Sequence, residues 1–562
     1  MKFICNNNNE NVINGILEKY NITKEELLNP SKDYKMGYKN MGKATDRIIK
    51  AINNKERVGI LVDDDCDGFT SSAVMYRYLD RLGVPITIFF HEGKQHGLNN
   101  RVVQDVNGSN VDLLIVPDAG SSDTHYEELK GIEVVIFDHH LFDAELPEKV
   151  IRVNNQDISN ENGNPNLTGV GMVYRALQML DKKLEIDCAN EDLDLVALGQ
   201  IGDSSDYSEQ EIRWIVNEGL RNLNNKLIRE LLKDRLKRKE KVTGRDCSFE
   251  VIPYINAVTR VGSIDEKVEL FEGLTQNSKL DKKEKVICKR KDKKTKKFNK
   301  VEELRSGYEI LANKLATIKK RQAKLVDKFI NTGIEEIYTQ GGVVIAKAYE
   351  GVDTGLTGLI ASNLSNKYGR PVVLVSPHGE EIYTGSIRGK EERITSLKDW
   401  CEGTSLFNWV QGHDNAAGCE ISKDNIDELV SRTEEVEIIK EVEVDYYATN
   451  ISVATINEIY DNRGLFGGKI SYPKIGIENK VFKKTMIQPR GEKTLAIRDG
   501  NIEYIIFNVS DEIRKELTWG FNQTVKVNIL GVTGINHFMG KAIPQIIVNR
   551  IEVVKDKFDF DF

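Results

Sequence analysis

The sequence has few cysteines and no long apolar run, and both absences narrow the class of protein. Its seven cysteines are scattered over 562 residues with no C-x-x-C pair. This spacing argues against a zinc ribbon or a disulfide framework and favours reduced thiols. No apolar run approaches the roughly 20 residues that a membrane-spanning helix needs, and the first residues lack the hydrophobic region of a signal peptide. We therefore expect a cytoplasmic protein without membrane contact.

The net charge bears on the class of ligand, and the length on the number of domains. The net charge of −8 argues mildly against a nucleic-acid-binding protein, although the charge of a whole chain says nothing about local patches. A chain of 562 residues is too long for one hydrophobic core, so three or four domains are expected.

Two stretches alternate strand-like and helix-like patterns. From 58 to about 215 the alternation, with helices expected at 71–83 and 169–183, predicts a mostly parallel sheet covered on both faces. Residues 210–275 have the pattern of consecutive helices. Residues 340–440 return to an α/β pattern, including a helix that should end on Gly369.

The segments between and after these stretches have other residue patterns. The basic run 278–300 is either a solvated loop or helix extension, or a surface that contacts phosphates. Residues 301–331 predict a long helix between two domains. From about 450 the pattern is β-rich, with a hairpin turning at Asp499–Gly500, and it predicts a small barrel, of the oligonucleotide-binding (OB) type among others. The end, 555–562, is either a frayed tail or a partner-binding peptide.

Three apolar, β-rich runs each end on a carboxylate, at Asp63, Asp118 and Asp138. Such runs are typical of buried parallel strands, and open α/β sheets place their chemistry at the carboxyl ends of strands. A further acidic cluster follows a helix-like run. So many charged groups would need cations to neutralise them in a dry site. The candidates are Asp63, Asp65, Asp67, Asp118, Asp138, His139, His140 and Asp203.

A mixed set of carboxylates and imidazoles suits Mn²⁺ or Mg²⁺ better than structural zinc. Two such ions are the usual device for phosphoester hydrolysis, and Asp118, alone on its strand, is the expected bridging ligand. The alternative is a calcium loop, because D-D-D-C-D-G loosely fits that spacing. Val74 stands where that loop needs Glu, and a buried strand precedes the motif, so we favour the metal phosphoesterase.

These residues resemble the four motifs of the DHH phosphoesterases: Asp63-x-Asp65-x-Asp67-Gly68, Asp118, Asp138-His139-His140 and Asp203. The segment 255–271 looks like the one that follows the catalytic domain in RecJ single-strand-specific exonucleases. The segments 355–375, 384–388 and 411–418 look like that family's DHHA1-type second domain. The resemblance covers nearly the whole chain in order.

The resemblance implies an α/β fold in four parts. N-terminal helices and a parallel-sheet DHH catalytic domain would occupy 1–275, and the basic segment and a long connecting helix 276–335. A smaller α/β DHHA1-like domain would occupy 336–445. An OB-like β-barrel that binds nucleic acid would follow over 446–562, with the acidic-aromatic tail at its end.

It also implies roles for single residues. Two Mn²⁺ or Mg²⁺ ions would be surrounded by Asp63, Asp65, Asp67, Asp118, His139 and Asp203. His140 would face the scissile phosphate, and Asp138 would orient the two histidines. Arg260, Ser386 and Arg388 would grip the 5′ phosphate end. His413 is either a further substrate contact or a buried histidine that holds its turn.

The expected function is a 5′→3′ exonuclease that degrades single-stranded DNA in repair, recombination or replication. One alternative is a DHH phosphodiesterase for short oligonucleotides or cyclic dinucleotides. The other is a catalytically silent scaffold that binds single strands, although the acidic motifs are all present. The expected partners are single-stranded DNA and a single-strand-binding protein or helicase, and the chain is expected to be a monomer.

Overall fold

The computed structural model describes residues 1–5, 11–31, 36–291, 298–390, 393–436, 441–491, 493–519, 522–538 and 540–554. The chain forms two compact units. Unit 1 consists of Met1–Lys24, Ala323–Arg463 and Ser471–Phe562, and unit 2 of Glu25–Gln322 and Gly464–Ile470. The first 24 residues therefore group with the C-terminal half, a placement that sequence patterning did not predict.

The core of unit 2 is a parallel sheet, as the alternating pattern predicted, and it has five strands. Apolar side chains fill both of its faces because the inner strands β2 and β4 are apolar throughout and β5 is apolar between Glu133 and Asp138. In spatial order the strands are β3 (Ile86–Phe90), β2 (Val58–Val62), β4 (Leu113–Pro117), β5 (Glu133–Asp138) and β6 (Val150–Asn154).

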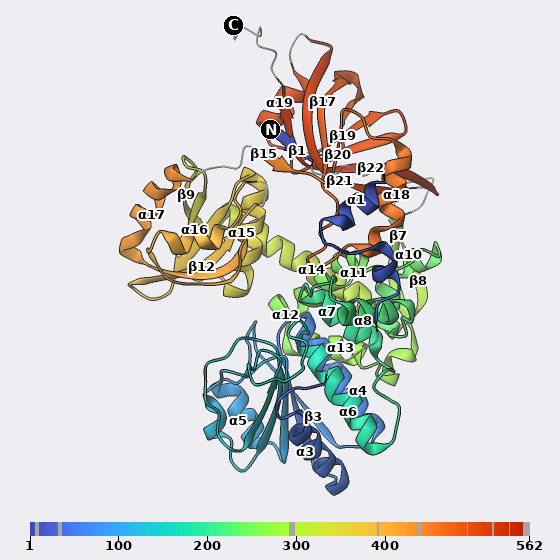
Figure 1. Ribbon diagram of the computed structural model, residues 1–562, viewed down its shortest axis with the longest axis vertical. Coiled ribbons are helices and arrows are strands. Elements are labelled where there is room, and N and C mark those ends of the chain that lie inside the picture. Colours follow the sequence, from blue (N-terminus) through green and yellow to red (C-terminus); the bar gives the residue numbers. More distant parts are fainter. Residues whose placement is uncertain are drawn as a thin grey trace. The chain divides into compact units, whose positions relative to one another are not determined.

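Helices cover the two faces of this sheet unequally (Figure 1). One face packs on α3 (Met41–Asn54), α4 (Cys66–Arg81), α6 (Gly169–Leu184) and α7 (Leu193–Gly202). The other packs on α5 (Asn100–Gly108) and the turn after β4. Helix α4 begins five residues before the predicted 71–83, because Asp65 accepts the Gly68 amide and caps it.

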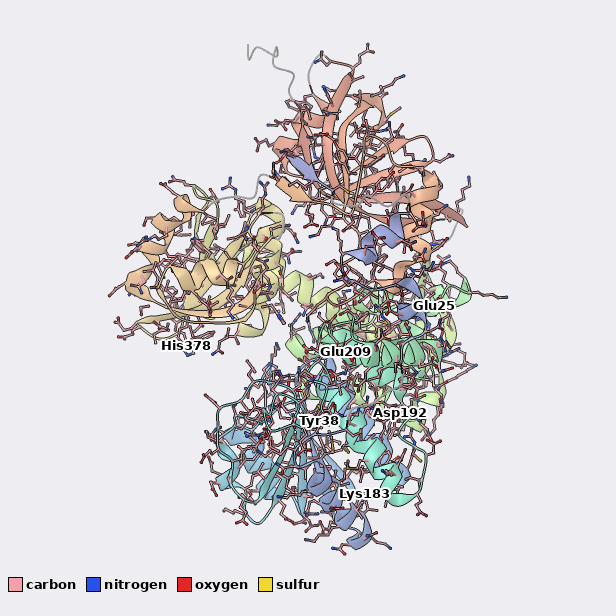
Figure 2. All side chains as sticks on the ribbon, in the orientation of Figure 1. Glu25, Tyr38, Lys183, Asp192, Glu209 and His378 are labelled. Atoms are coloured by element: carbon pink, nitrogen blue, oxygen red, sulfur yellow. The ribbon has the colours of Figure 1, made fainter. Side chains whose placement is uncertain are left out.

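Charged side chains tie the covering helices together. Lys183 on α6 donates to Asp46 on α3 at 2.7 Å, and Asp192 accepts from Arg77 and Arg81 on α4; Figure 2 labels Lys183 and Asp192. These contacts fix the orientation of α4 and α6, whose N-terminal ends reach the acidic edge of the sheet.

Residues 210–275 are helical, as predicted. They form α8 (Gln210–Arg221), α9 (Lys226–Leu231), α10 (Lys233–Lys237), α11 (Gly244–Glu250), α12 (Ile252–Val261) and α13 (Ile264–Leu274). Two short helices precede the sheet in the chain, α1 (Val12–Glu18) and α2 (Lys24–Leu28).

The basic run corrects one prediction. Its described residues 283–291 and 298–300 are neither a loop nor a helix extension, because β7 (Lys283–Lys291) pairs with β8 (Phe298–Ser306) in an antiparallel hairpin. The long helix α14 consequently begins at Gly307 and ends at Thr332, not at 301. Ser306 and Glu309 set this start, since each side chain accepts the other's backbone amide in a capping box.

A six-stranded mixed sheet forms the first part of unit 1. Strands β10 and β11 pair in parallel and the other neighbours are antiparallel. Helix α15 (Thr354–Tyr368) ends on Gly369 in the left-handed conformation, as predicted. The strand order is β13 (Phe407–His413), β14 (Ala416–Ser422), β12 (Ile382–Arg388), β11 (Val372–Pro377), β10 (Val344–Ala348) and β9 (Ile334–Tyr338), with α16 (Leu397–Gly403) and α17 (Ile426–Arg432) beside them.

A seven-stranded sheet forms the C-terminal part. It contains the predicted hairpin, β19 (Thr494–Asp499) and β20 (Ile502–Phe507). Its closure into an OB-like barrel stays a prediction, and the tail 555–562 lies outside the described residues. The order is β16 (Tyr446–Ala448), β17 (Ile475–Lys483), β21 (Thr524–Phe538), β22 (Lys541–Val553), β20, β19 and β18 (Ile487–Pro489).

The remaining elements of unit 1 are short. Strand β1 (Lys2–Ile4) pairs with β15 (Glu441–Glu443), and α18 (Val453–Asp461) and α19 (Asp511–Thr518) flank the C-terminal sheet. Within the residues that the structure covers, no helix has the length and apolar character needed to cross a bilayer.

Candidate active site

Three neighbouring strands of the unit 2 sheet deliver acids to one edge. Strands β2, β4 and β5 are adjacent, so the residues at their carboxyl ends converge as predicted. Asp63 and Asp118 follow β2 and β4, and Asp138 ends β5. One oxygen or nitrogen atom from each of Asp63, Asp65 and Asp118 lies within 4.8 Å of the others, and the same holds for Asp118, His139 and His140.

Asp118 stands at the centre of this set. Its backbone adopts a φ of +65°, and its amide donates to the Phe137 carbonyl at 2.7 Å, which turns the side chain into the site. Both carboxylate oxygens are buried and have no hydrogen-bond partner, although His139 Nε2 lies 3.2 Å from Oδ1. Burial, together with the Asp67 carboxylate, raises the pKa of Asp118 well above its usual value. Buried carboxylate oxygens that accept no hydrogen bond are atoms that a cation would satisfy.

Asp67 is held by the start of helix α6. The amides of Gly169 and Val170 donate to its two oxygens at 2.7 and 3.1 Å, and burial nevertheless raises its pKa. The approach is so close that a Cβ at Gly169 would lie 2.2 Å from Asp118 Oδ1. A Cβ at Gly199 of α7 would lie 2.5 Å from Asp67 Oδ1. Because these two positions are glycines, no Cβ clashes with the carboxylates of Asp118 and Asp67.

Asp63 has a partner that sequence reasoning missed. His96 Nδ1 lies 2.6 Å from its Oδ2, and the Gly97 amide donates to its Oδ1 at 3.1 Å. Burial raises the pKa of Asp63, and the hydrogen bond to Asp63 raises the pKa of His96. The sequence does contain a signal for this partner: His96 and Gly97 follow β3, and the loop after a parallel strand lies at this edge of the sheet.

The histidine pair after β5 is anchored by Asp138. Its Oδ1 accepts the His139 amide at 2.7 Å, and His140 Nδ1 lies 2.8 Å from the same atom. Burial would raise the pKa of Asp138, but the hydrogen bond and charge of His140 lower it below the usual range. The same hydrogen bond raises the pKa of His140 to about 9. Asp138 thus orients a cationic His140, whose side chain is 57% exposed.

Asp203 closes the set from the end of helix α7. His139 Nε2 lies 3.7 Å from Asp203 Oδ2 and 4.0 Å from Asp67 Oδ2, so this imidazole faces three carboxylates. Burial raises the pKa of Asp203 to about 6. The donors are carboxylate oxygens and one imidazole nitrogen, which suits Mn²⁺ or Mg²⁺. The residues therefore fit divalent cations at this edge of the sheet.

A second missed feature is a buried ion pair behind the site. Lys267 on α13 donates to Asp64 Oδ1 at 2.6 Å, and their side chains are 0% and 1% exposed. Its ammonium also donates to the carbonyls of His91 and Gly93, at 2.8 and 2.7 Å. Burial raises the pKa of Asp64 to about 6 and lowers that of Lys267. The pair fastens the loop that carries His96, and no sequence pattern links positions 203 residues apart.

Arg260 lies on the last turn of α12, in the same unit. Burial lowers its pKa and the nearby Asp65 carboxylate opposes this shift. Burial also lowers the pKa of Lys94, with Arg260 adding to the effect. Arg260 and Lys94 thus place positive charge beside the acids, where a phosphate would need it.

Three other predicted residues lie together in unit 1. Ser386 and Arg388 alternate along β12, and the register places Arg388 opposite Ala416, which in turn faces His413. Ser386 Oγ lies 2.8 Å from Thr357 Oγ1 on α15, and Arg388 packs so tightly on this helix that a Cβ at Gly358 would meet its Nη2. His413 is exposed at the end of β13, so the buried-histidine alternative is wrong.

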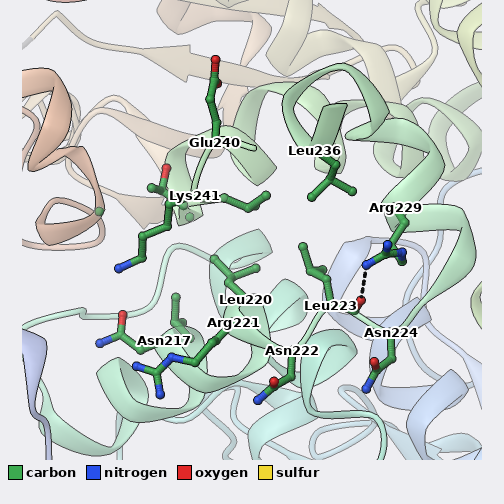
Figure 3. Close-up of a pocket in the computed structure, with 15 residues that line it drawn as sticks. Asn217, Leu220, Arg221, Asn222, Leu223, Asn224, Arg229, Leu236, Glu240 and Lys241 are labelled. Carbon is green, nitrogen blue, oxygen red and sulfur yellow. Dashed lines mark hydrogen bonds between the residues drawn. The ribbon is translucent and has the colours of Figure 1, made fainter. Parts of the chain in front are cut away.

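A cavity of about 590 Å³ in unit 2 is separate from this constellation (Figure 3). Residues of α8 to α11 line it, and none of the acids above does. Figure 3 shows Arg229 bonded to the Leu223 carbonyl at its wall. The cavity is therefore not part of the candidate active site at the sheet edge.

Both α/β parts of the chain match known family models. Residues 57–200 match the DHH family, N-terminal domain, and residues 340–437 match the DHHA1 domain. The fold and the acidic edge thus define a DHH-type phosphoesterase. The chain belongs to the DHH family, among the RecJ-like single-stranded-DNA-specific exonucleases.

Individual relatives cover most of the chain. The SPbeta prophage-derived protein YorK of Bacillus subtilis (strain 168) is 33% identical over 92% of this chain and 91% of its own length. The single-stranded-DNA-specific exonuclease RecJ of Escherichia coli (strain K12) is 23% identical over 91% of this chain and 89% of its own. RecJ of Thermus thermophilus, crystallised with Mn²⁺, superposes with a TM-score of 0.68 at 19% identity, over 96% of this chain and 76% of that one.

Proposed function

We propose that the protein is a 5′→3′ exonuclease that hydrolyses the phosphodiester bonds of single-stranded DNA with two divalent cations. The observation that carries this proposal is Asp118, a buried carboxylate without a hydrogen-bond partner, surrounded by Asp63, Asp67 and His139. Mn²⁺ or Mg²⁺ would supply an activated water and neutralise charge on the phosphate. The names of the RecJ relatives support the choice of substrate.

The side chains at this edge have separate roles in the proposed reaction. Asp63, Asp65, Asp67, Asp118, His139 and Asp203 would hold the cations. His140 has Nδ1 bound to Asp138, which leaves Nε2 to donate to an oxygen of the scissile phosphate. A positive group fixed in advance stabilises charge that grows on that oxygen during hydrolysis.

Selection of a 5′ end requires groups beyond the acids. Arg388 offers a planar fork of donors for a terminal phosphate, Ser386 a hydroxyl and Arg260 a second guanidinium. His413 adds a contact to the strand. We propose further that α14 connects the catalytic and DHHA1 parts, and that the C-terminal sheet closes as an OB-like barrel that extends the DNA path. A role in DNA repair, with a single-strand-binding protein or helicase as partner, belongs to the same proposal.

One degradation assay tests the core of this function. Single- and double-stranded DNA labelled at the 5′ or the 3′ end is incubated with and without Mn²⁺, with dinucleotides as a separate substrate. We expect mononucleotides from the 5′ end of single strands, and no hydrolysis in EDTA. Release from the 3′ end would reject the polarity, and a preference for dinucleotides would reject the exonuclease.

A further inference from the structure

The hairpin β7–β8 forms a sheet of its own in unit 2. The chain enters and leaves it at neighbouring points, because the Gly307 amide donates to the Lys282 carbonyl at 3.1 Å. Each strand has nine residues, so the ribbon is about 30 Å long. The function proposed above makes no use of it.

The two faces of this ribbon differ in exposure and in charge. Directly paired residues of an antiparallel ribbon share a face, and the register pairs Lys285 with Leu304, Ile287 with Glu302, and Lys289 with Lys300. The opposite face is partly buried and includes Arg305, which binds Glu303 at 2.9 Å. We call the open side the lysine face; its described members include Lys283, Lys285, Ile287, Lys289, Lys300 and Leu304.

Among its described residues, the lysine face carries four cations against one acid, Glu302. The contact between Lys285 and Glu302 is long, 3.4 Å, and both side chains are more than 60% exposed, so it neutralises little. Ile287 and Leu304 are 75% and 62% exposed. In the sequence, the run 278–300 contains 12 basic and three acidic residues, although the whole chain has a net charge of −8.

We propose that the lysine face is a secondary docking surface that binds the phosphate backbone of single-stranded DNA outside the active site. Alternate residues of a strand lie about 7 Å apart, so the lysines present separated point charges that match successive phosphates of an extended strand. Ile287 and Leu304 offer apolar contact to sugars and bases between them. Contacts of this kind are independent of sequence, as an exonuclease that moves along its substrate requires. The inference rests on the proposed function, because it takes single-stranded DNA as the substrate.

The test compares a charge variant with a matched control. In the test variant, Lys283, Lys285, Lys289 and Lys300 become Gln. In the control, four exposed lysines elsewhere in unit 2 become Gln: Lys43, Lys50, Lys130 and Lys182. KM and kcat are measured with Mn²⁺ on 5′-phosphorylated single strands of about five and about 60 nucleotides, the shorter within one binding site. Binding of the longer strand is followed in EDTA by fluorescence anisotropy over a range of salt.

We expect the test variant to raise KM for the long strand about tenfold, to leave kcat and the short strand unchanged, and to reduce the log–log salt slope by roughly 2 to 3. The control should match the wild type. A second variant, with 283–306 replaced by a Gly-Ser bridge between Lys282 and Gly307, should reproduce these changes. Equal losses on short and long strands would overturn the inference, as would unchanged KM and slope.

Other partners give distinguishable results. If only binding of a duplex weakens, the face binds double-stranded DNA and the inference is wrong. If DNA binding is unchanged and binding of polyglutamate is lost, the partner is an acidic protein and the inference is again wrong. A wild type that shows the hairpin-dependent salt slope in EDTA but does not hydrolyse DNA would refute the proposed function and leave this inference standing.

Discussion

Replacing Asp118 by Asn should stabilise the protein without metal while it removes activity. The carboxyl group is buried and neither of its oxygens accepts a hydrogen bond, and burial holds its pKa well above the usual value. At pH 8 it therefore either stays charged without a partner or holds a proton against its intrinsic preference, and both cost free energy. Asn has the same shape, carries no charge and tolerates the φ of +65°. It avoids this cost but cannot serve as an anionic ligand.

The magnitude follows from the burial. An unsatisfied buried group costs about 1–3 kcal/mol, and more if it is charged. We expect an unfolding midpoint in EDTA at pH 8 that is higher by roughly 2–6 °C. Because the folded-state pKa is raised, the penalty is present above that pKa and disappears as the pH falls toward the unfolded value. The stability gain of Asp118→Asn should therefore shrink as the pH is lowered from 8 to about 4.

The assay is thermal unfolding in EDTA and in Mn²⁺, alongside hydrolysis of a 5′-labelled single strand. At 100 times its Kd, Mn²⁺ should stabilise the wild type by about 2.7 kcal/mol and Asp118→Asn far less, with activity reduced at least a thousandfold. The control is Asp105→Asn, at an exposed position of α5, which should match the wild type. A variant less stable than the wild type in EDTA, or one still stabilised by Mn²⁺, would refute the reasoning.

Four further changes test other parts of the site. Lys267→Met should destabilise the fold by about 3–5 kcal/mol because Asp64 is left buried and charged, and adding Asp64→Asn should recover most of this loss in denaturant unfolding. His140→Gln should lower kcat about a hundredfold or more with little change in KM. A change in KM alone would show that His140 does not act on the scissile phosphate during hydrolysis. Arg388→Lys should lose about tenfold of the preference for 5′-phosphorylated over 5′-hydroxyl strands, because an ammonium has no planar fork. Gly169→Ala should abolish Mn²⁺-dependent activity while circular dichroism stays unchanged, since its Cβ would displace the Asp118 carboxylate.

Local patterns in the sequence were sufficient to predict much of the fold. Apolar runs that end on Asp63, Asp118 and Asp138 predicted parallel strands, and parallel strands deliver their carboxyl ends to one edge. The helix that ends on Gly369 and the hairpin at Asp499–Gly500 followed from the conformational preferences of glycine. The prediction of a loop or helix extension in the basic run was wrong for its paired residues because charge hides the strand pattern: Val286, Ile287 and Cys288 are too few to mark a strand against twelve basic residues.

What the sequence determined by itself is which acids and histidines meet at the edge of the sheet, because their order and the strands before them make them recognisable. What only the tertiary structure decided is the state of each group. The unpaired oxygens of Asp118, the bond from His96 to Asp63 and the buried pair of Lys267 and Asp64 depend on residues 33 to 203 positions apart, or on the absence of any donor. The physical reason is range: periodicity and turn preferences act within a few residues, whereas burial and charge act between segments that meet only when the chain has folded.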